Sequence, residues 1–223
     1  MAIDVSVIVT NYNNKPFIGR AIRSCLKQSL EKDRYEVIVV DDCSTDESRD
    51  VIIGFKDQVK RVYLDQNVGV AMASNVGIME ALGSFIIRVD SDDYISEHTL
   101  LFMTEILMAN PDIGFVYSDH LRVDKSERVL ERVDINTLDL LFRHGAGIIF
   151  RKSYLEQIGL YDSKLRNAED YDLLKRYIKN FNGYHLRLPL YRYRQHDSNM
   201  TRDESVRKEW ETKVDSKQNE NRK

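Results

Sequence analysis

The chain has little cysteine, proline and tryptophan: among its 223 residues are two cysteines, three prolines and one tryptophan. Two cysteines are too few for a disulfide scaffold, and Cys25 and Cys43 lack the spacing of a metal site. They suit a reducing cytoplasm. The sequence has no run of roughly 18 apolar residues and no basic, apolar leader at its start. We therefore expect a cytoplasmic protein without a membrane span.

Neither sign of charge dominates, and two glycine-rich phosphate motifs are missing. With 33 basic and 36 acidic residues, the net charge of −3 provides no cationic field for nucleic acid. Residues 11–14 are Asn-Tyr-Asn-Asn where a dinucleotide fold carries Gly-x-Gly-x-x-Gly, and no Gly-Lys-Ser/Thr triplet occurs. If the protein binds a diphosphate, a divalent cation is the economical way to neutralise it.

The first half of the chain alternates between strand and helix patterns. We predict strands over 5–10, 35–40, 59–64 and 85–90, and helices over 17–26, after a Ser44–Glu47 capping box, and over 70–82. This order favours an α/β fold with a mostly parallel central sheet flanked by helices, in one compact domain.

The second half is less regular. We expect a helix from Ser96 to Ala109, a strand over 113–118, a hairpin or surface excursion over 122–136, a strand over 145–150, helices over 152–158 and 170–180, and an extended segment over 185–194. Residues 202–223 form a charged tail, either an exposed helix or disordered.

Carboxylates gather where two of the predicted strands end. Asp90 ends the apolar strand over 85–90, and Asp92 and Asp93 follow it. Asp41 and Asp42 come at the end of the second strand. Mutual repulsion would push protons onto such a cluster, whereas a hard divalent ion would let the carboxylates stay ionised. Ligands of open α/β sheets bind beyond the carboxyl ends of strands. The alternative is an ordinary Asp-rich turn.

Several blocks, in one order, resemble the family 2 glycosyltransferases with the GT-A fold. The resemblance covers about residues 6–201 and is carried by Ser6–Asn13, Val39–Asp46, Asn67–Gly69 with Ala73, Asn75 and Gly77, Asp90–Asp92, Gly147–Asp162, Ala168–Leu173 and Tyr193–Thr201. It implies a nucleotide-sugar-binding half over 1–95, an acceptor-binding half over 96–201, and a Mg²⁺ or Mn²⁺ cofactor.

The resemblance also implies roles for single residues. Tyr12 would stack on the base and Asp42 would accept a hydrogen bond from uracil, and Asp170 would be the catalytic base of an inverting transfer. Asp92 would be the direct metal ligand, with His196 reaching the metal or the diphosphate. The other expected donor contacts are Thr10, Asn75, Asp90 and Ser91.

By the same resemblance, the product is a bacterial surface polysaccharide or related glycan. The donor is expected to be a UDP-sugar, and the acceptor a saccharide or lipid-linked saccharide met peripherally at the inner face of the membrane. The tail offers basic residues for such a contact, interleaved with acids: Arg202, Arg207, Lys208, Lys213, Lys217, Arg222 and Lys223.

Other interpretations remain open for the chain and for its residues. Aspartate phosphatases also place Asp-x-Asp after a strand, although on the opening strand, and a nucleotide-binding module without catalysis would keep the first blocks. Asp170 could simply open a helix, as carboxylates favour the first turn. Asp46 we assign to loop and cap chemistry.

Overall fold

The computed structural model describes residues 2–197, 199 and 204–220. The first half alternates as predicted: β1 (Val5–Asn11), α1 (Lys15–Leu26), β2 (Tyr35–Asp41), α2 (Ser48–Ile53), the 3₁₀ helix η1 (Lys56–Gln58), β3 (Lys60–Tyr63), α3 (Val70–Met79) and β4 (Phe85–Asp90). The second half contains β5 (Tyr94–Ile95), α4 (Thr99–Ala109), β6 (Ile113–Val123), β7 (Val129–Val133), α5 (Leu138–His144), β8 (Ile149–Arg151), α6 (Lys152–Ile158), α7 (Glu169–Tyr177), β9 (Asn182–Arg194) and α8 (Glu204–Glu220).

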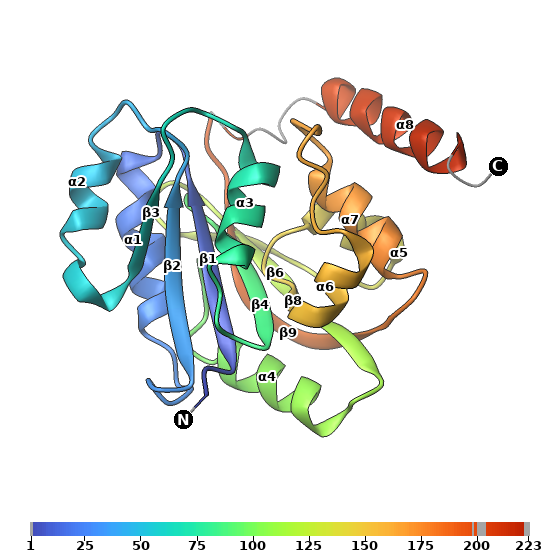
Figure 1. Ribbon diagram of the computed structural model, residues 1–223, viewed down its shortest axis with the longest axis horizontal. Helices are drawn as coiled ribbons and strands as arrows, with labels where there is room; N and C mark the ends of the chain where they lie inside the picture. Colours follow the sequence, from blue (N-terminus) through green and yellow to red (C-terminus); the bar gives the residue numbers. More distant parts are fainter. Residues whose placement is uncertain (1, 198, 200–203, 221–223) are drawn as a thin grey trace.

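The strands form one mixed sheet in the order β3-β2-β1-β4-β8-β6-β9-β5, with β7 paired to β6 (Figure 1). β3, β2, β1 and β4 are parallel. β8 is antiparallel to both β4 and β6, β5 is antiparallel to β9, and β9 is parallel to β6. The α/β class is therefore confirmed, but the mostly parallel sheet holds only for the first half. Strand patterns alone do not set direction once the strand–helix alternation ends.

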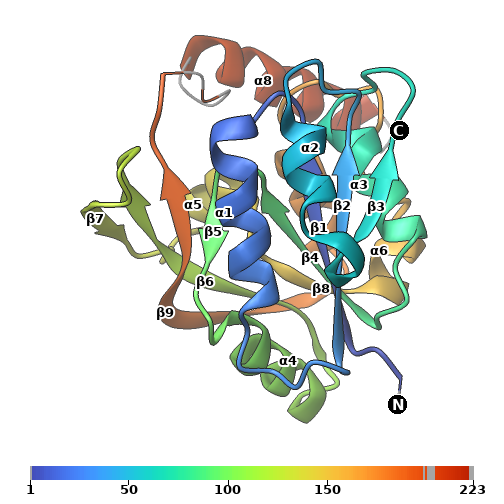
Figure 2. The same cartoon turned by 90° about the vertical axis from the view of Figure 1, so that its left-hand side faces the viewer.

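Helices cover both faces of the sheet (Figure 2). Along β1 the side chains alternate: Val7 and Val9 belong to the core beneath α1, α2 and α4, whereas Ile8 belongs to the core beneath α3, α6 and α7. Strands buried on both faces are apolar almost throughout. Polar side chains are consequently concentrated where the strands end.

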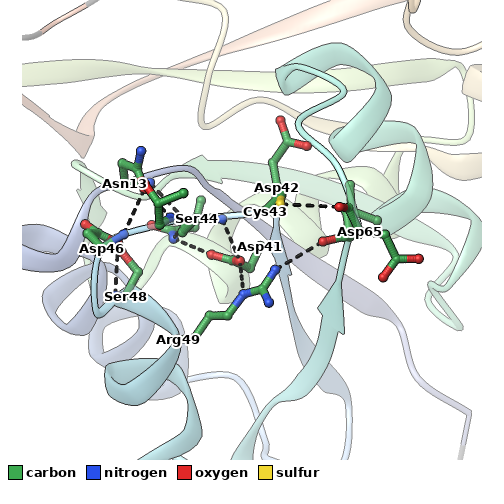
Figure 3. Close-up of polar contacts among 12 residues, drawn as sticks. Asn13, Asp41, Asp42, Cys43, Ser44, Asp46, Ser48, Arg49 and Asp65 are labelled. Atoms are coloured by element: carbon green, nitrogen blue, oxygen red, sulfur yellow. Dashed lines mark hydrogen bonds and ion pairs between the residues drawn. The ribbon is translucent and has the colours of Figure 1, made fainter.

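The capping box predicted at Ser44 is wrong, because other groups use this side chain (Figure 3). α2 begins at Ser48, and Ser44 Oγ accepts a hydrogen bond from the N–H of Asn13 (2.9 Å). Instead, the Asp46 carboxylate accepts hydrogen bonds from the first N–H groups of two helices. These are the N–H of Ser48 in α2 (3.0 Å) and the N–H of Lys15 in α1 (2.9 Å). Asp46 thus has the capping role expected of it, at two helices.

The hairpin expected over 122–136 is formed by β6 and β7, joined by a short turn that suits antiparallel strands. Three short elements, η1, β5 and α5, were not predicted. β5 has only two residues, Tyr94 and Ile95, and it exists because it pairs with β9. No local pattern predicts a strand that short.

Residues 204–220 of the charged tail form α8, which packs against α7 (Figure 1). Val214 of α8 is buried, and Asp215 accepts hydrogen bonds from Lys175 Nζ (2.6 Å) and the Tyr171 hydroxyl (3.1 Å). Of the basic tail residues, Arg202, Arg222, Lys223 and the Arg207 side chain lie outside the described part of the structure. Within that part, no helix has the length and apolarity needed to cross a bilayer.

Candidate active site

A cleft of about 1290 Å³ opens beyond the carboxyl ends of β1, β2 and β4. Parallel strands end at one edge of a sheet, and the register places Thr10 of β1 beside Asp90 of β4. The cleft lies where open α/β sheets bind ligands. It brings together most of the predicted site residues: Thr10, Tyr12, Asp42, Asp90, Ser91, Asp92, Asp170 and His196.

The two carboxylates at the end of β2 have different tasks. Figure 3 shows Asp41 and Asp42 pointing in different directions, with Asp41 against Arg49. Burial acts to raise the pKa of Asp41, but hydrogen bonds from Ser44, Arg49 and Asn11 outweigh it and bring the pKa below its ordinary value. Asp41 is therefore an ionised residue that holds the loop in place.

Asp42 lines the cleft and is held by backbone groups. Its carboxylate accepts hydrogen bonds from the N–H groups of Val68 (2.7 Å) and Gly69 (2.8 Å), which fix its orientation. Tyr12 lies beyond the end of β1, is 47% exposed, and lines the same cleft. This part of the cleft therefore combines an accessible aromatic ring with an oriented hydrogen-bond acceptor.

Asn75 is not brought to the cleft with the other predicted donor contacts. Its side-chain amide donates to the carbonyl of Tyr161 (2.9 Å) and accepts from the N–H of Tyr161 (3.0 Å). It therefore connects α3 to the segment before α7. Ser91 does line the cleft, and its hydroxyl accepts a hydrogen bond from the Asn14 side chain (2.8 Å), which joins the loops after β1 and β4.

The three aspartates at the end of β4 and just beyond it lie in different environments. Burial raises the pKa of Asp90 to about 6, against the opposing effect of Arg88. Asp92 faces His196, with 2.9 Å between Oδ2 and Nε2. Asp93 is turned into the protein and accepts hydrogen bonds from the Tyr191 hydroxyl (2.8 Å) and the N–H of Arg194 (2.7 Å). Asp93 thus anchors the end of β9, from which His196 follows.

Asp92 and His196 can supply part of a divalent metal site. A carboxylate oxygen and an imidazole nitrogen suit Mn²⁺, and oxygen ligands suit Mg²⁺. Among the described residues, no group of three or more His, Cys, Asp or Glu side chains is arranged to hold a metal ion. An ion held by these two side chains would need its remaining ligands from a bound substrate or from water.

Asp170 lies in the first turn of α7, on the far side of the cleft, and pairs with Arg88 of β4. Arg88 Nη2 lies 2.6 Å from Asp170 Oδ2, and Nη1 lies 3.2 Å from Glu169 Oε1. Burial raises the pKa of Asp170 to about 7, although the Arg88 guanidinium acts to lower it. A carboxyl group with a pKa near neutrality is suited to general-base work.

Sequence reasoning gave no site role to Arg88 or Gly145, and it included Glu169 in the block around Asp170 without assigning it a role of its own. Arg88 was assigned to a buried strand, but one charged residue inside an apolar strand has to be paired, and that signal was present. Gly145 has φ +63°, and a Cβ at this position would lie 2.5 Å from Asp170 Oδ2. No sequence pattern could show that contact, because residues 145 and 170 are brought together only by the tertiary fold.

Comparison with known proteins decides the family. The sequence model described as Glycosyl transferase family 2 matches residues 6–159, more than half of the chain. The chain belongs to glycosyltransferase family 2. Over 192 residues it is 37% identical to the succinoglycan biosynthesis protein ExoO of Rhizobium meliloti (strain 1021), covering 77% of this chain and 54% of that protein.

Solved structures agree with this assignment. The structure of Staphylococcus aureus TarS 1–349 in complex with UDP-GlcNAc superposes with a TM-score of 0.76 at 25% identity, covering 88% of this chain and 60% of that one. The mannosyltransferase PcManGT of Pyrobaculum calidifontis, in complex with GDP-Man and Mn²⁺, gives 0.70 at 19% identity and covers 89% and 59%. The GT-A fold expected from the sequence is confirmed, and the chain spans little more than half of these proteins.

Proposed function

We propose that the protein is a metal-dependent, inverting glycosyltransferase that moves a sugar from a UDP-sugar to an acceptor hydroxyl. The observation that supports this most directly is the arrangement of the cleft. Asp90 and Asp92 line it from the nucleotide-binding half and Asp170 from the acceptor half, with Arg88 within 3.2 Å of both Asp90 and Asp170. Donor-binding and base groups therefore share one site.

Different residues would act on the acceptor hydroxyl and on the departing diphosphate. Asp170 would take the proton of the acceptor hydroxyl as it attacks the anomeric carbon, and such assistance is worth about 10²–10⁴-fold in rate. Asp92 and His196 would hold the divalent ion, which when bound stabilises the charge on the departing diphosphate. A single base on the acceptor side suffices for direct displacement, which inverts the anomeric configuration.

Tyr12 and Asp42 are suited to bind uracil, the base of a uridine nucleotide. An aromatic face can stack on the pyrimidine, and the Asp42 carboxylate, fixed by two backbone N–H groups, can accept from the ring N–H. The UDP-GlcNAc-bound TarS structure supports this choice. Competition binding with UDP, GDP, CDP and dTDP tests it, and tighter binding of GDP or dTDP would replace uridine in the proposal.

The proposed acceptor is a saccharide or lipid-linked saccharide of a surface polysaccharide, in keeping with the name of ExoO. Peripheral membrane contact in the cytoplasm is part of this proposal. In α8, however, Lys213 pairs with Glu209 (2.7 Å) and Lys217 with Asp162, so these cations are already partly neutralised. Sedimentation with anionic vesicles at low salt is the test, and no binding there would remove membrane contact from the proposal.

A donor screen that reads released UDP, beginning with UDP-GlcNAc and Mn²⁺, tests the main proposal. Asp170→Asn should cut turnover by roughly 10²–10⁴-fold with UDP affinity nearly unchanged. Asp172→Asn is the matched control, because Asp172 lies on the same helix but bonds Arg176 (2.8 Å). It should cost stability without affecting the turnover of the folded enzyme.

Three results would change the conclusion. Near-normal turnover of Asp170→Asn would remove the base, and an NMR spectrum of the product with the donor's anomeric configuration retained would exclude direct displacement. Release of inorganic phosphate from a generic phosphoester would favour the phosphatase alternative. Binding of UDP-sugars without turnover of any of them would favour a non-catalytic module.

A further inference from the structure

Arg88 is a buried cation surrounded by carboxylates. Its side chain is only 7% exposed, and its nitrogens lie 3.2 Å from Asp90 Oδ1, 3.2 Å from Glu169 Oε1 and 2.6 Å from Asp170 Oδ2. Side chains two apart on a strand share a face, so Arg88 and Asp90 point to the same side of β4. One guanidinium therefore connects the end of the Asp-x-Asp strand with the first turn of α7.

The pair of Arg49 and Asp41 behaves differently. Asp41 accepts hydrogen bonds from Arg49, Ser44 and Asn11, and its pKa lies below the ordinary value although it is buried. At Asp170 the guanidinium is shared with two further carboxylates, and it acts to lower the pKa there against both burial and Glu169. The charge of Arg88 is thus enough to keep Asp170 ionisable near neutrality but not enough to make it a permanent anion.

The groups that face Asp170 come from three segments. They are Arg88 and Asp90 of β4, Glu169 of α7 and Tyr161 of the segment before α7, whose ring centroid lies 5.5 Å from the Arg88 guanidinium. Burial has the largest effect on the pKa of Asp170, Glu169 also acts to raise it, and Arg88 opposes both. Removing Arg88 would leave burial and repulsion without an opposing charge.

We propose that Arg88 is a positioning residue for the transfer reaction: it keeps Asp170 ionised and holds Oδ2, so that the other carboxylate oxygen faces the acceptor hydroxyl. By holding Asp90 as well, it sets the distance between the donor-binding strand and the base. This inference rests on the proposed role of Asp170. It assigns no contact between Arg88 and the substrates.

Carboxyl ¹³C NMR titration of the full chain tests this without requiring activity. The Asp170 signal is assigned by its absence from Asp170→Asn. In Arg88→Gln the Asp170 midpoint should rise by roughly 1–3 pH units, because a nearby opposite charge has been removed. Arg88→Lys keeps a charge and should give a smaller rise. Glu169→Gln removes a repelling anion and should lower the midpoint.

Arg151→Gln is the matched control, because Arg151 lies on β8 and its guanidinium donates to the backbone carbonyls of Ile113 (2.8 Å) and Leu107 (2.6 Å). It should cost stability without moving the Asp170 midpoint. If Arg88→Gln does not fold, the direction in which the Asp170 midpoint shifts in Arg88→Lys and in Glu169→Gln still tests the proposal. In active enzyme, the acidic limb of the kcat/KM profile should move with the NMR midpoint.

Failure of this inference can be told apart from failure of the proposed function. An Asp170 midpoint that stays within about 0.3 pH unit of wild type in the Arg88 and Glu169 variants would overturn the role of Arg88, whatever the turnover. If the midpoints shift as expected but Asp170→Asn keeps its turnover, Arg88 still controls Asp170, and the assignment of Asp170 as the base is what fails.

Discussion

Gly145→Ala should disable the base without changing any ionisable group. Gly145 follows α5 with φ +63°, and a Cβ there would lie 2.5 Å from Asp170 Oδ2 and 2.7 Å from its Cγ. Restoring an ordinary contact of about 3.4 Å or more needs a shift of roughly 1 Å. Arg88 Nη2 lies 2.6 Å from the same oxygen, so a shift of the carboxylate would disturb that ion pair.

A displacement of roughly 1 Å in a catalytic group can cost about 10²-fold, so we expect kcat to fall by that factor or more. The backbone conformation adds a stability cost of roughly 1–3 kcal/mol, because a residue with a Cβ is strained at this φ. UDP affinity should stay within about threefold of wild type, since Asp42 and Tyr12 are untouched.

Gly159→Ala is the control for the backbone cost. Gly159 ends α6 with φ +91°, and a Cβ there would meet nothing within 4 Å. It should lose roughly 1 kcal/mol of stability and keep its kcat. The assay is UDP release at saturating donor, with urea unfolding of each variant. Equal kcat for both alanine variants would refute the reasoning, because the predicted difference comes only from the collision with Asp170.

The remaining predictions concern metal, anchoring and acid stability. UDP should raise the melting temperature more in Mn²⁺ than in EDTA, and Asp92→Ala should abolish that difference; equal stabilisation by UDP in both would exclude metal-dependent binding. Asp93→Asn should weaken the hydrogen bonds that hold the end of β9, lower the melting temperature and reduce the metal-dependent part of UDP binding. An unchanged metal-dependent part would show that Asp93 does not position His196. Although burial acts to raise the pKa of Asp119, hydrogen bonds from Arg132, the Ile135 N–H and His185 bring it below its ordinary value of 3.8. The stability that it adds is therefore complete above that value and lost as pH falls through the lowered pKa. Asp119→Asn should cost roughly 1–3 kcal/mol at pH 7 and progressively less as pH falls below 3.8, as measured by urea unfolding.

The sequence alone determined the first half of the fold, from β1 to β4. β1, β2 and β4 are mostly apolar because helices cover both faces of the sheet, so their positions and the carboxylates at their ends could be predicted. The position of Asp170 at the start of a helix was predictable as well. Residues whose role depends on a strand end or a helix start are the ones that sequence reasoning found.

Only the tertiary structure decided how the two halves meet. Contacts between segments far apart in the chain set the directions of β8 and β9 and the docking of α8. They also explain why Asn75 bonds Tyr161 and does not line the cleft. The same is true of Arg88, because its partners at 169 and 170 lie more than eighty residues away. A local sequence pattern indicates which residues are buried or cap a helix. The partners of a buried charge depend on which carboxylates the tertiary fold places beside it.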